Sequence, residues 1–272
     1  MKNKIQEIQN LALQIRKHAL KMTHSGQSSH IGSILSCTDI LATLYGGVLN
    51  FDPNNPKFNN RDRFILSKGH AGAGVYAALA ESKFFSPNEL NNHYKNGSIF
   101  SGHVSHKGVP GVELSTGSLG HGLGVGCGIS YFAKINKKSF KTYVVMSDGE
   151  LDEGSIWEAA MFAAHFKLDN LIAIIDCNKL QSLDTTKNTI NLEPLEEKWK
   201  AFNWDVVKLD GHNISNLLSE LLKARSSKKP LCLICDTIKG KGVSFMENQV
   251  LWHYKPPSKD DLDSALKEIE KK

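Results

Sequence analysis

The fold is decided by the stretch TYVVMSDGE at residues 142–150. Its first five residues lack the polar alternation of a half-exposed strand, which is typical of a strand buried on both faces of a parallel sheet. The Ser-Asp-Gly that follows is turn-forming and ends the strand. A second apolar run, LIAIIDCN, occupies residues 171–178. The two runs predict two inner strands of a parallel sheet.

Outward from these runs, short apolar segments alternate with segments of helical periodicity. Residues 4–21 place Ile5, Ile8, Leu11 and Ile15 on one face, as an amphipathic helix does. This alternation predicts an α/β fold with a doubly wound, mainly parallel sheet flanked by helices. We expect strands over 64–67, 142–146, 171–175, 204–209 and 231–235, and helices over 4–21, 71–82, 155–166 and 214–224.

The length and composition fit one large domain. The chain has 272 residues, of which 40% are hydrophobic and 22% charged, as in a soluble globular protein. No linker rich in Pro, Gly or Ser divides it, so we expect a single domain over 1–272. Its last segment, 256–272, predicts a charged helix that begins with the capping pattern Ser258-Lys-Asp-Asp261.

Charge and cysteine content exclude several classes of function. The net charge of +5 comes from scattered lysines, with four arginines, whereas nucleic-acid surfaces cluster both types beside aromatic residues. We therefore expect no nucleic-acid partner. No stretch reaches the roughly 18 apolar residues of a membrane span and no signal peptide is evident, so we expect a cytoplasmic protein without membrane association.

Five cysteines without zinc-type spacing fit a reducing compartment. Cys232 and Cys235 form a CxxC pair. Within an expected strand, residues at this spacing point to opposite faces of the sheet. The sequence therefore disfavours redox chemistry at this pair.

Hard oxygen ligands follow the two decisive strands. Asp148 comes directly after the first and Asn178 after the second. Because neighbouring strands lie only about 5 Å apart, the two side chains are expected to converge at one edge of the sheet. A carboxylate, an amide oxygen and a backbone carbonyl suit Mg²⁺ or Ca²⁺, and Mg²⁺ commonly shares its coordination with phosphates. Gly149 would let the backbone approach those phosphates, although an Asp-Gly pair alone is usually only a turn.

A glycine-rich segment and a set of histidines belong to the same prediction. Glycine recurs at 120, 122, 124, 126 and 128. Since each glycine inside a helix costs about 1 kcal/mol relative to alanine, this segment indicates close approach of the backbone to a ligand or to another helix. Imidazole carries protons near neutral pH. Four histidines in turns or beside aromatic residues are therefore candidates for proton transfer: His30, His70, His103 and His253.

Four segments together resemble the amino-terminal domain of transketolase: 61–71 (RDRFILSKGHA), 115–122 (STGSLGHG), 147–181 and 239–248 (KGKGVSFMEN). The resemblance covers nearly the whole chain and is strongest over 147–181, which is similar to the thiamine diphosphate signature of that family. It implies a thiamine diphosphate-binding fold and a transferase. The implied reaction moves a two-carbon ketol unit from a ketose phosphate to an aldose phosphate, with thiamine diphosphate and Mg²⁺ as cofactors.

Carried over residue by residue, the resemblance implies a metal site and a diphosphate site. The side chains of Asp148 and Asn178 and the carbonyl of Leu180 would bind Mg²⁺, which in turn binds the diphosphate. His70 and Gly149 would contact the diphosphate directly.

The resemblance implies three further groups of residues. The cofactor rings would lie against Gly117, Ser118 and Leu119, and the thiazolium against Ile238. The catalytic residues, which would bind the substrate's hydroxyls and move protons, are His30, His103 and His253. Glu153, at the cofactor site, and Glu158 match glutamates that face the partner subunit in the family's dimer.

The sequence differs from the family in its length and at three positions. Full-length transketolases continue into a second domain that activates the aminopyrimidine and holds the sugar phosphate, whereas this sequence stops at Lys272. We therefore expect an amino-terminal subunit of a split transketolase, which is inactive until it forms an α2β2 assembly with a separate carboxy-terminal subunit. Ser147, His121 and Ile31 stand where the family usually has Gly, Gln and Pro. None of these changes removes an implied metal ligand.

Two other functions fit the same residues. One is a subunit of another thiamine diphosphate enzyme, such as deoxyxylulose phosphate synthase or the α chain of a 2-oxo-acid dehydrogenase; segments 61–71 and 239–248 favour transketolase over both. The other is a non-catalytic thiamine diphosphate-binding module, against which Asp148, Asn178 and the four histidines argue. The sugars, and whether they belong to the pentose phosphate pathway, are left open.

Overall fold

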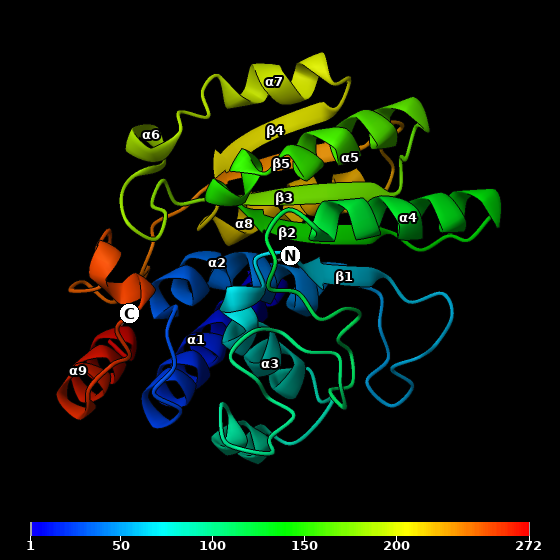
Figure 1. The fold of residues 1–272 in the computed structure, drawn as a ribbon. Helices are drawn as coiled ribbons and strands as arrows, with labels where there is room; N and C mark the ends of the chain where they lie inside the picture. The colour runs from blue at the N-terminus through cyan, green and yellow to red at the C-terminus, as the bar shows by residue number, and fades with distance from the viewer. Residues whose placement is uncertain (1, 272) are drawn as a thin grey trace.

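The structure is a computed structural model in which residues 2–271 are described. Its centre is a five-stranded sheet with the strand order β1-β2-β3-β5-β4 (Figure 1). The strands are β1 (Arg63–Leu66), β2 (Thr142–Ser147), β3 (Leu171–Cys177), β4 (Asp205–Asp210) and β5 (Leu231–Asp236). All neighbouring pairs in this order are parallel. The predicted fold class is confirmed, and its two decisive strands, β2 and β3, lie side by side.

Helices cover both faces of the sheet (Figure 1). One face carries α4 (Gly122–Ile135), α5 (Gly154–His165) and α7 (Leu195–Ala201). The other side carries α1 (Lys2–Ser25), α2 (Ile31–Thr43), α3 (Gly72–Glu81) and α8 (Ile214–Ala224), with α9 (Lys259–Ile269) beside α1. Short helical turns connect them: η1 (Leu44–Val48), η2 (Gly69–Ala71), η3 (Pro87–Asn92), η4 (Gly149–Asp152), α6 (Thr186–Thr189) and η5 (Val250–His253).

The sheet separates two hydrophobic cores, because alternate residues of each strand point to opposite faces. In β5, Leu233 and Cys235 belong to the core beneath α1, α2 and α8. Cys232 and Ile234 belong to the core beneath α4, α5 and α7. The two cysteines of the CxxC pair therefore lie on opposite faces, and burial raises the pKa of both thiols well above the ordinary value.

Helix α2 is an element that the sequence did not predict. Every residue of Ile31–Thr43 is buried, so the helix has no polar face and no amphipathic period to reveal it. Together with η1 it forms an 18-residue window, Ile31–Val48, that meets the length and hydropathy of a membrane span. Our expectation that no stretch would do so was therefore wrong. However, 89% of this window is buried inside the protein, where α2 packs against α1 and α3 as a core helix.

The chain ends differ slightly from expectation. Helix α1 continues to Ser25 rather than ending at residue 21. Helix α9 begins after the predicted capping box, in which Ser258 and Asp261 bond to each other's backbone amides. It ends at Ile269, and the part of the expected tail helix that falls on Lys272 lies outside the described residues.

Candidate active site

A cavity of about 200 Å³ opens at the carboxyl ends of β2 and β3. The register of the sheet places it there, since Ser147 at the end of β2 pairs with Asp176 in β3. Asp148 and Asn178 consequently leave the sheet at the same edge, as predicted. The sequence-predicted residues that line the cavity are His70, Leu119, Asp148, Gly149, Asn178, Leu180 and His253. They are joined by Ser33, Ser147, Gln181, Ser182 and Tyr254.

The three predicted metal ligands lie in two adjacent turns that hydrogen bonds join. The Asp148 carboxylate accepts the backbone N–H of Lys179 at 2.5 Å and that of Gly149 at 2.8 Å. Asn178 Oδ1 accepts the N–H of Leu180 at 3.1 Å. The end of β2 is therefore fastened to the turn that follows β3, and the carboxylate and amide oxygens are held beside each other.

The electrostatics of Asp148 favour a bound cation. Its side chain is almost fully buried, and burial raises the pKa of its carboxyl to about 6, against the opposing effect of the two N–H donors. A nearby positive charge would favour the ionised form. Among the described residues, no group of three or more His, Cys, Asp or Glu could hold a metal. A cation here would therefore rely on one carboxylate with neutral oxygen donors, a set that suits Mg²⁺ and Ca²⁺.

Four histidine rings from distant parts of the chain cluster together, and two of them, His70 and His253, line the cavity. The ring centroid of His30 lies 4.9 Å from that of His253, 5.0 Å from His70 and 5.7 Å from His103. Burial lowers the pKa of His30 to about 4 and that of His253 to about 3, and it also lowers the pKa of His70 and His103. At neutral pH these imidazoles are uncharged, so each ring has one N–H donor and one acceptor.

Backbone conformation and close backbone contacts bring the four histidines together. His30 precedes α2 with a left-handed φ of 74°, a conformation that costs a residue with a Cβ about 1–2 kcal/mol. Its N–H donates to the carbonyl of His253 at 2.8 Å. A Cβ at Gly69 would lie 2.3 Å from the carbonyl oxygen of Thr116, and one at Gly117 would lie 3.3 Å from the His103 ring. Glycine at 69 therefore lets the 116–117 segment pass against η2 and reach the histidines.

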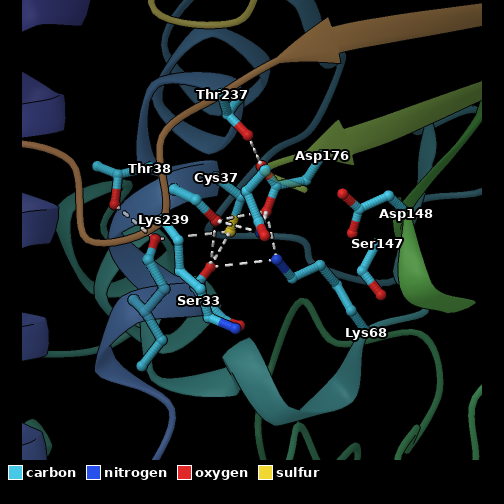
Figure 2. Close-up of polar contacts among 12 residues, drawn as sticks. Ser33, Cys37, Thr38, Lys68, Ser147, Asp148, Asp176, Thr237 and Lys239 are labelled. Carbon is cyan, nitrogen blue, oxygen red and sulfur yellow. Dashed lines mark hydrogen bonds and ion pairs between the residues drawn. The ribbon is translucent and has the colours of Figure 1, made fainter. Parts of the chain in front are cut away.

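Sequence reasoning missed a buried ion pair beneath the cavity. Lys68 and Asp176 are both fully buried and form a salt bridge (Figure 2). Asp176 also accepts hydrogen bonds from Ser36, Thr237 and Asn178. The bond from the Asn178 amide N–H, at 3.4 Å, turns its oxygen away from Asp176. Lys68 and Asp176 flank predicted residues in the sequence, but they are 108 positions apart, and nothing in the local sequence signals their contact.

Two further buried groups were also missed. Lys239 Nζ donates to the carbonyls of Leu180 at 3.0 Å and Gln181 at 2.9 Å, and contacts His253 Nδ1 at 2.9 Å. Burial lowers the pKa of Lys239 to about 8. Glu150 accepts from the Ser67 hydroxyl and from backbone amides of the 120 and 147 positions. It thereby ties the ends of β1 and β2 to the glycine-rich segment.

The glycine-rich segment has two parts with different surroundings. Added Cβ atoms at Gly122 and Gly126 would lie 2.3 Å from Ser67 and 2.6 Å from Val144, so these glycines let α4 pack closely on the sheet. Added Cβ atoms at Gly124 and Gly128 would meet nothing within 4 Å. Helix packing within the chain therefore explains only part of this pattern.

Besides His30 and His103, which belong to the histidine cluster, five predicted residues lie outside the cavity lining. Gly117 and Ser118 are exposed at its edge, and Glu153 and Glu158 are exposed around the start of α5. Ile238 is half-buried after β5, and its N–H donates to His212 at 2.9 Å. The structure thus brings together the predicted histidines and oxygen donors, whereas these five residues surround them.

Comparison with known proteins places this geometry in a family. Residues 8–270 match the family model described as transketolase, thiamine diphosphate binding domain. The chain is 41% identical to the A subunit of apulose-4-phosphate transketolase from Phocaeicola vulgatus, covering 97% of this chain and 95% of the relative. It is 39% identical to the 6-deoxy-6-sulfo-D-fructose transketolase subunit SqwG of a Clostridium species, covering 97% of both.

Longer transketolases match over part of their length. The human transketolase is 36% identical over 98% of this chain and 42% of its own length. The crystal structure of transketolase from Campylobacter jejuni superposes with a TM-score of 0.92 and 30% identity, covering 97% of this chain and 43% of that one. The chain thus spans less than half the length of the solved transketolases that it matches.

Proposed function

The chain belongs to the transketolase family, as its thiamine diphosphate-binding domain, and from that premise we propose that it is the amino-terminal subunit of a two-chain transketolase. The observation that carries the proposal is that Asp148, Asn178, His70 and His253 line one cavity. The ring of His30 contacts both of these histidines, and that of His103 contacts His30. Three relatives matched over nearly their whole length are themselves named as subunits of transketolases. That match supports a function shared with a second polypeptide.

In the proposed site, Mg²⁺, or Ca²⁺ in its place, is held by Asp148, Asn178 and the Leu180 carbonyl. Support comes from the buried carboxylate, which has a raised pKa and lies beside an amide oxygen. Lys239 donates to that carbonyl as well as to Gln181, so it keeps a partner if a cation takes Leu180. The cation would fix the diphosphate, which neutral His70 and the N–H groups near Gly149 would contact.

The remaining roles follow the same placement. Gly117, Ser118 and Leu119 would lie against the cofactor rings, and Ile238 beside the thiazolium. When bound, thiamine diphosphate supplies the electron sink for cleaving the bond next to a ketose carbonyl. His30, His103 and His253 would orient the hydroxyls of the sugar and relay protons. Their lowered pKa values support this role, because a neutral imidazole can donate one hydrogen bond and accept another.

The surface over α4 and α5 supports an assembly with a second copy of the chain. Val125 and Phe132 of α4 and Met161 and Phe162 of α5 are between 38% and 53% exposed. Gly124 and Gly128 are open on the same helix, each at a cost of about 1 kcal/mol relative to alanine. Exposed apolar side chains beside open glycines favour contact with another backbone. Glu153 and Glu158 would face that copy.

The separate carboxy-terminal subunit would cover the mouth of the cavity, giving an α2β2 assembly that acts on sugar phosphates. Leu251 and Tyr254, 61% and 57% exposed, flank His253 at that mouth. The five free and buried cysteines support action in the reducing cytoplasm. The donor and acceptor sugars would be chosen largely by the carboxy-terminal subunit.

Purification from the native cells tests the assembly. The tagged chain would be isolated with thiamine diphosphate and Mg²⁺ present, and mass spectrometry would identify co-purifying chains. We expect a stoichiometric partner and transfer of a two-carbon unit from xylulose 5-phosphate or another ketose phosphate to an aldose phosphate. A lone chain that binds the cofactor without turnover would instead indicate a non-catalytic binding module.

Substitution of Asp148 tests the cation site. Asp148→Ala should abolish the Mg²⁺-dependent part of thiamine diphosphate binding measured by calorimetry. The matched control is Asp169→Ala, which removes an exposed carboxylate paired with Lys134. Unchanged affinity in the Asp148 variant would refute the metal assignment.

A further inference from the structure

Three consecutive residues after β5 each form a hydrogen bond with a different part of the protein. The Thr237 hydroxyl donates to Asp176 at 2.5 Å, and Lys239 Nζ donates to the Leu180 carbonyl at 3.0 Å. Between them, the backbone N–H of Ile238 donates to Nε2 of His212 at 2.9 Å. His212 is therefore the partner that fixes the backbone of the middle residue.

The tautomer of His212 is set by its surroundings. Because Nε2 accepts the Ile238 N–H, the ring proton lies on Nδ1. Nδ1 faces the Asp39 carboxylate at 2.8 Å, so it donates to Asp39. That carboxylate is held in turn by a two-pronged contact with Arg16, at 3.0 and 2.7 Å. A carboxylate behind an imidazole fixes the orientation of the ring and makes its other nitrogen a better acceptor.

The backbone forces His212 to lie beside Ile238. Gly211 precedes it in the turn after β4, and its N–H donates to the carbonyl of Asp236 at 2.8 Å. A Cβ at position 211 would lie 2.5 Å from the Thr237 side chain and 3.0 Å from that of Cys235. Glycine at 211 therefore allows the ends of β4 and β5 to touch, which puts the next residue within reach of the Ile238 amide.

Arg16 extends the chain of contacts to the far end of the loop. Its Nε donates to the carbonyl of Lys241 at 3.3 Å. The Asp39 and Arg16 side chains are 8% and 11% exposed, and that of His212 is 12% exposed. Residues 238–241 are thus held from α1, α2 and the β4–α8 turn, by groups that do not line the cavity.

We propose that His212 is a positioning residue, which accepts the Ile238 amide N–H, with Asp39 and Arg16 behind it, and so holds the 238–241 loop in the shape that receives thiamine diphosphate. This inference rests on the proposed function, since it gives the loop its ligand. His212 touches neither the cavity nor the three predicted metal ligands. It acts through the position of Ile238 and, one residue on, of Lys239.

Two substitutions separate the two hydrogen bonds of the ring. In His212→Asn, the amide nitrogen takes the place of Nδ1 and still reaches Asp39, but no acceptor faces Ile238. In His212→Gln, the amide oxygen takes the place of Nε2 and accepts the Ile238 N–H. The two variants are similarly polar and both remove the ring. The difference between them therefore reports the acceptor.

The experiment uses the full chain, with Mg²⁺ and thiamine diphosphate as probes. Amide hydrogen exchange across the peptide containing Ile238 is measured without the cofactor, and the dissociation constant is measured by calorimetry. For His212→Asn we expect about tenfold faster exchange and about tenfold weaker binding, the effect of leaving one buried donor without its acceptor. His212→Gln should restore both values to within about threefold of the wild type.

Two results would overturn the inference: unchanged exchange at Ile238 in His212→Asn, or equal loss of binding in both variants. A melting temperature measured for each variant separates a general loss of stability from the local effect. If the wild-type chain fails to bind thiamine diphosphate even with its co-purified partner present, the proposed function fails. If the wild type binds and His212→Asn binds equally well, only this inference fails.

Discussion

Lys68 and Lys239 are two fully buried lysines near the same cavity, yet the protein holds them in opposite ways (Figure 2). Burial lowers the pKa of a lysine, but for Lys68 the carboxylate of Asp176 outweighs burial and raises the pKa above its ordinary value. Lys239 donates to two carbonyls and contacts a neutral histidine. Burial, reinforced by the charge of Lys68, lowers its pKa to about 8.

The difference separates a structural charge from one available to a ligand. Lys68 is neutralised within the chain, and the same carboxylate orients the amide of Asn178. Lys239 is a cation that no described ion pair holds, at the carbonyl of Leu180. An anionic ligand would therefore gain more from Lys239 than from Lys68, because only Lys239 lacks an opposite charge.

The largest effect is expected from removing the partner of Lys68. Asp176→Leu would leave the ammonium buried without a counter-charge, and we expect a loss of about 3–5 kcal/mol in the free energy of unfolding. Urea denaturation measures it. The double variant Lys68→Met with Asp176→Leu removes both charges and should recover most of the loss. Equal stability of the single variant and the wild type would show that the pair is not structural.

Removing Lys239 should weaken binding of the ligand rather than the stability of the fold. Lys239→Met should raise the dissociation constant for thiamine diphosphate about tenfold to a hundredfold, the range of a hydrogen bond to a charged group. The free energy of unfolding at neutral pH should stay equal or increase, because an unpaired buried charge is removed. Calorimetry and urea denaturation of the same preparation measure the two quantities. A large loss of stability with unchanged binding would reverse the roles assigned to the two lysines.

Between about pH 7 and about pH 9, the pH dependence of thiamine diphosphate binding should follow Lys239. Below its pKa of about 8, Lys239 is charged and attracts the diphosphate, and above it the attraction is lost. We expect affinity to fall about tenfold between about pH 7 and about pH 9, the difference between a charged and a neutral hydrogen bond. Lys68 keeps its charge throughout, since its pKa is raised.

Linkage fixes the sign for stability, which is opposite to that for binding. The folded pKa of Lys239 lies below its ordinary value of 10.5. The stability that it contributes is therefore fully present above pH 10.5 and is lost as the pH falls through about 8. The affinity for thiamine diphosphate, measured by calorimetric titration across this pH range, should be independent of pH in Lys239→Met. If the affinity fell equally with pH in the wild type and the variant, a group other than Lys239 would be responsible.

The smallest effect is expected for an exposed lysine near the same edge of the sheet. Lys208 is 40% exposed and lies 3.9 Å from Asp236 and 4.0 Å from Glu196. Lys208→Met should change the free energy of unfolding by less than about 1 kcal/mol, because solvent screens exposed pairs. It should leave thiamine diphosphate binding unchanged. It is therefore the control for both buried lysines, and a large effect would mean that general charge, rather than position, governs binding.

The sequence predicted those parts of the molecule that rest on local order. The apolar runs of β2 and β3 identified two buried parallel strands, and the polar residues at their ends, Asp148 and Asn178, fell at one cavity because parallel strands end at the same edge. The turns around the histidines were likewise visible. The apolar segments could not predict the position of one histidine relative to another, because tertiary packing determines it.

The missed elements are those whose signal is not local. Helix α2 is buried on every side and therefore shows no periodicity. Lys68 and Lys239 resemble surface lysines in sequence, because a buried lysine is recognisable only from the groups that surround it. Asp176 lies 108 positions from Lys68, and His212 lies 173 positions from Asp39. Contacts over such distances exist only once the sheet has formed.

The burial of the cysteines offers a practical route to observing the assembly. All five are buried free thiols. Burial raises the pKa of Cys37, Cys127 and Cys177 to about 12, and it raises that of Cys232 and Cys235 well above the ordinary value. The reactive species is the thiolate, so a maleimide dye would modify these positions slowly. A cysteine introduced on the exposed side of α5, at Glu158, would then react first, and the native cysteines could stay in place while fluorescence reports when a second protein covers that helix.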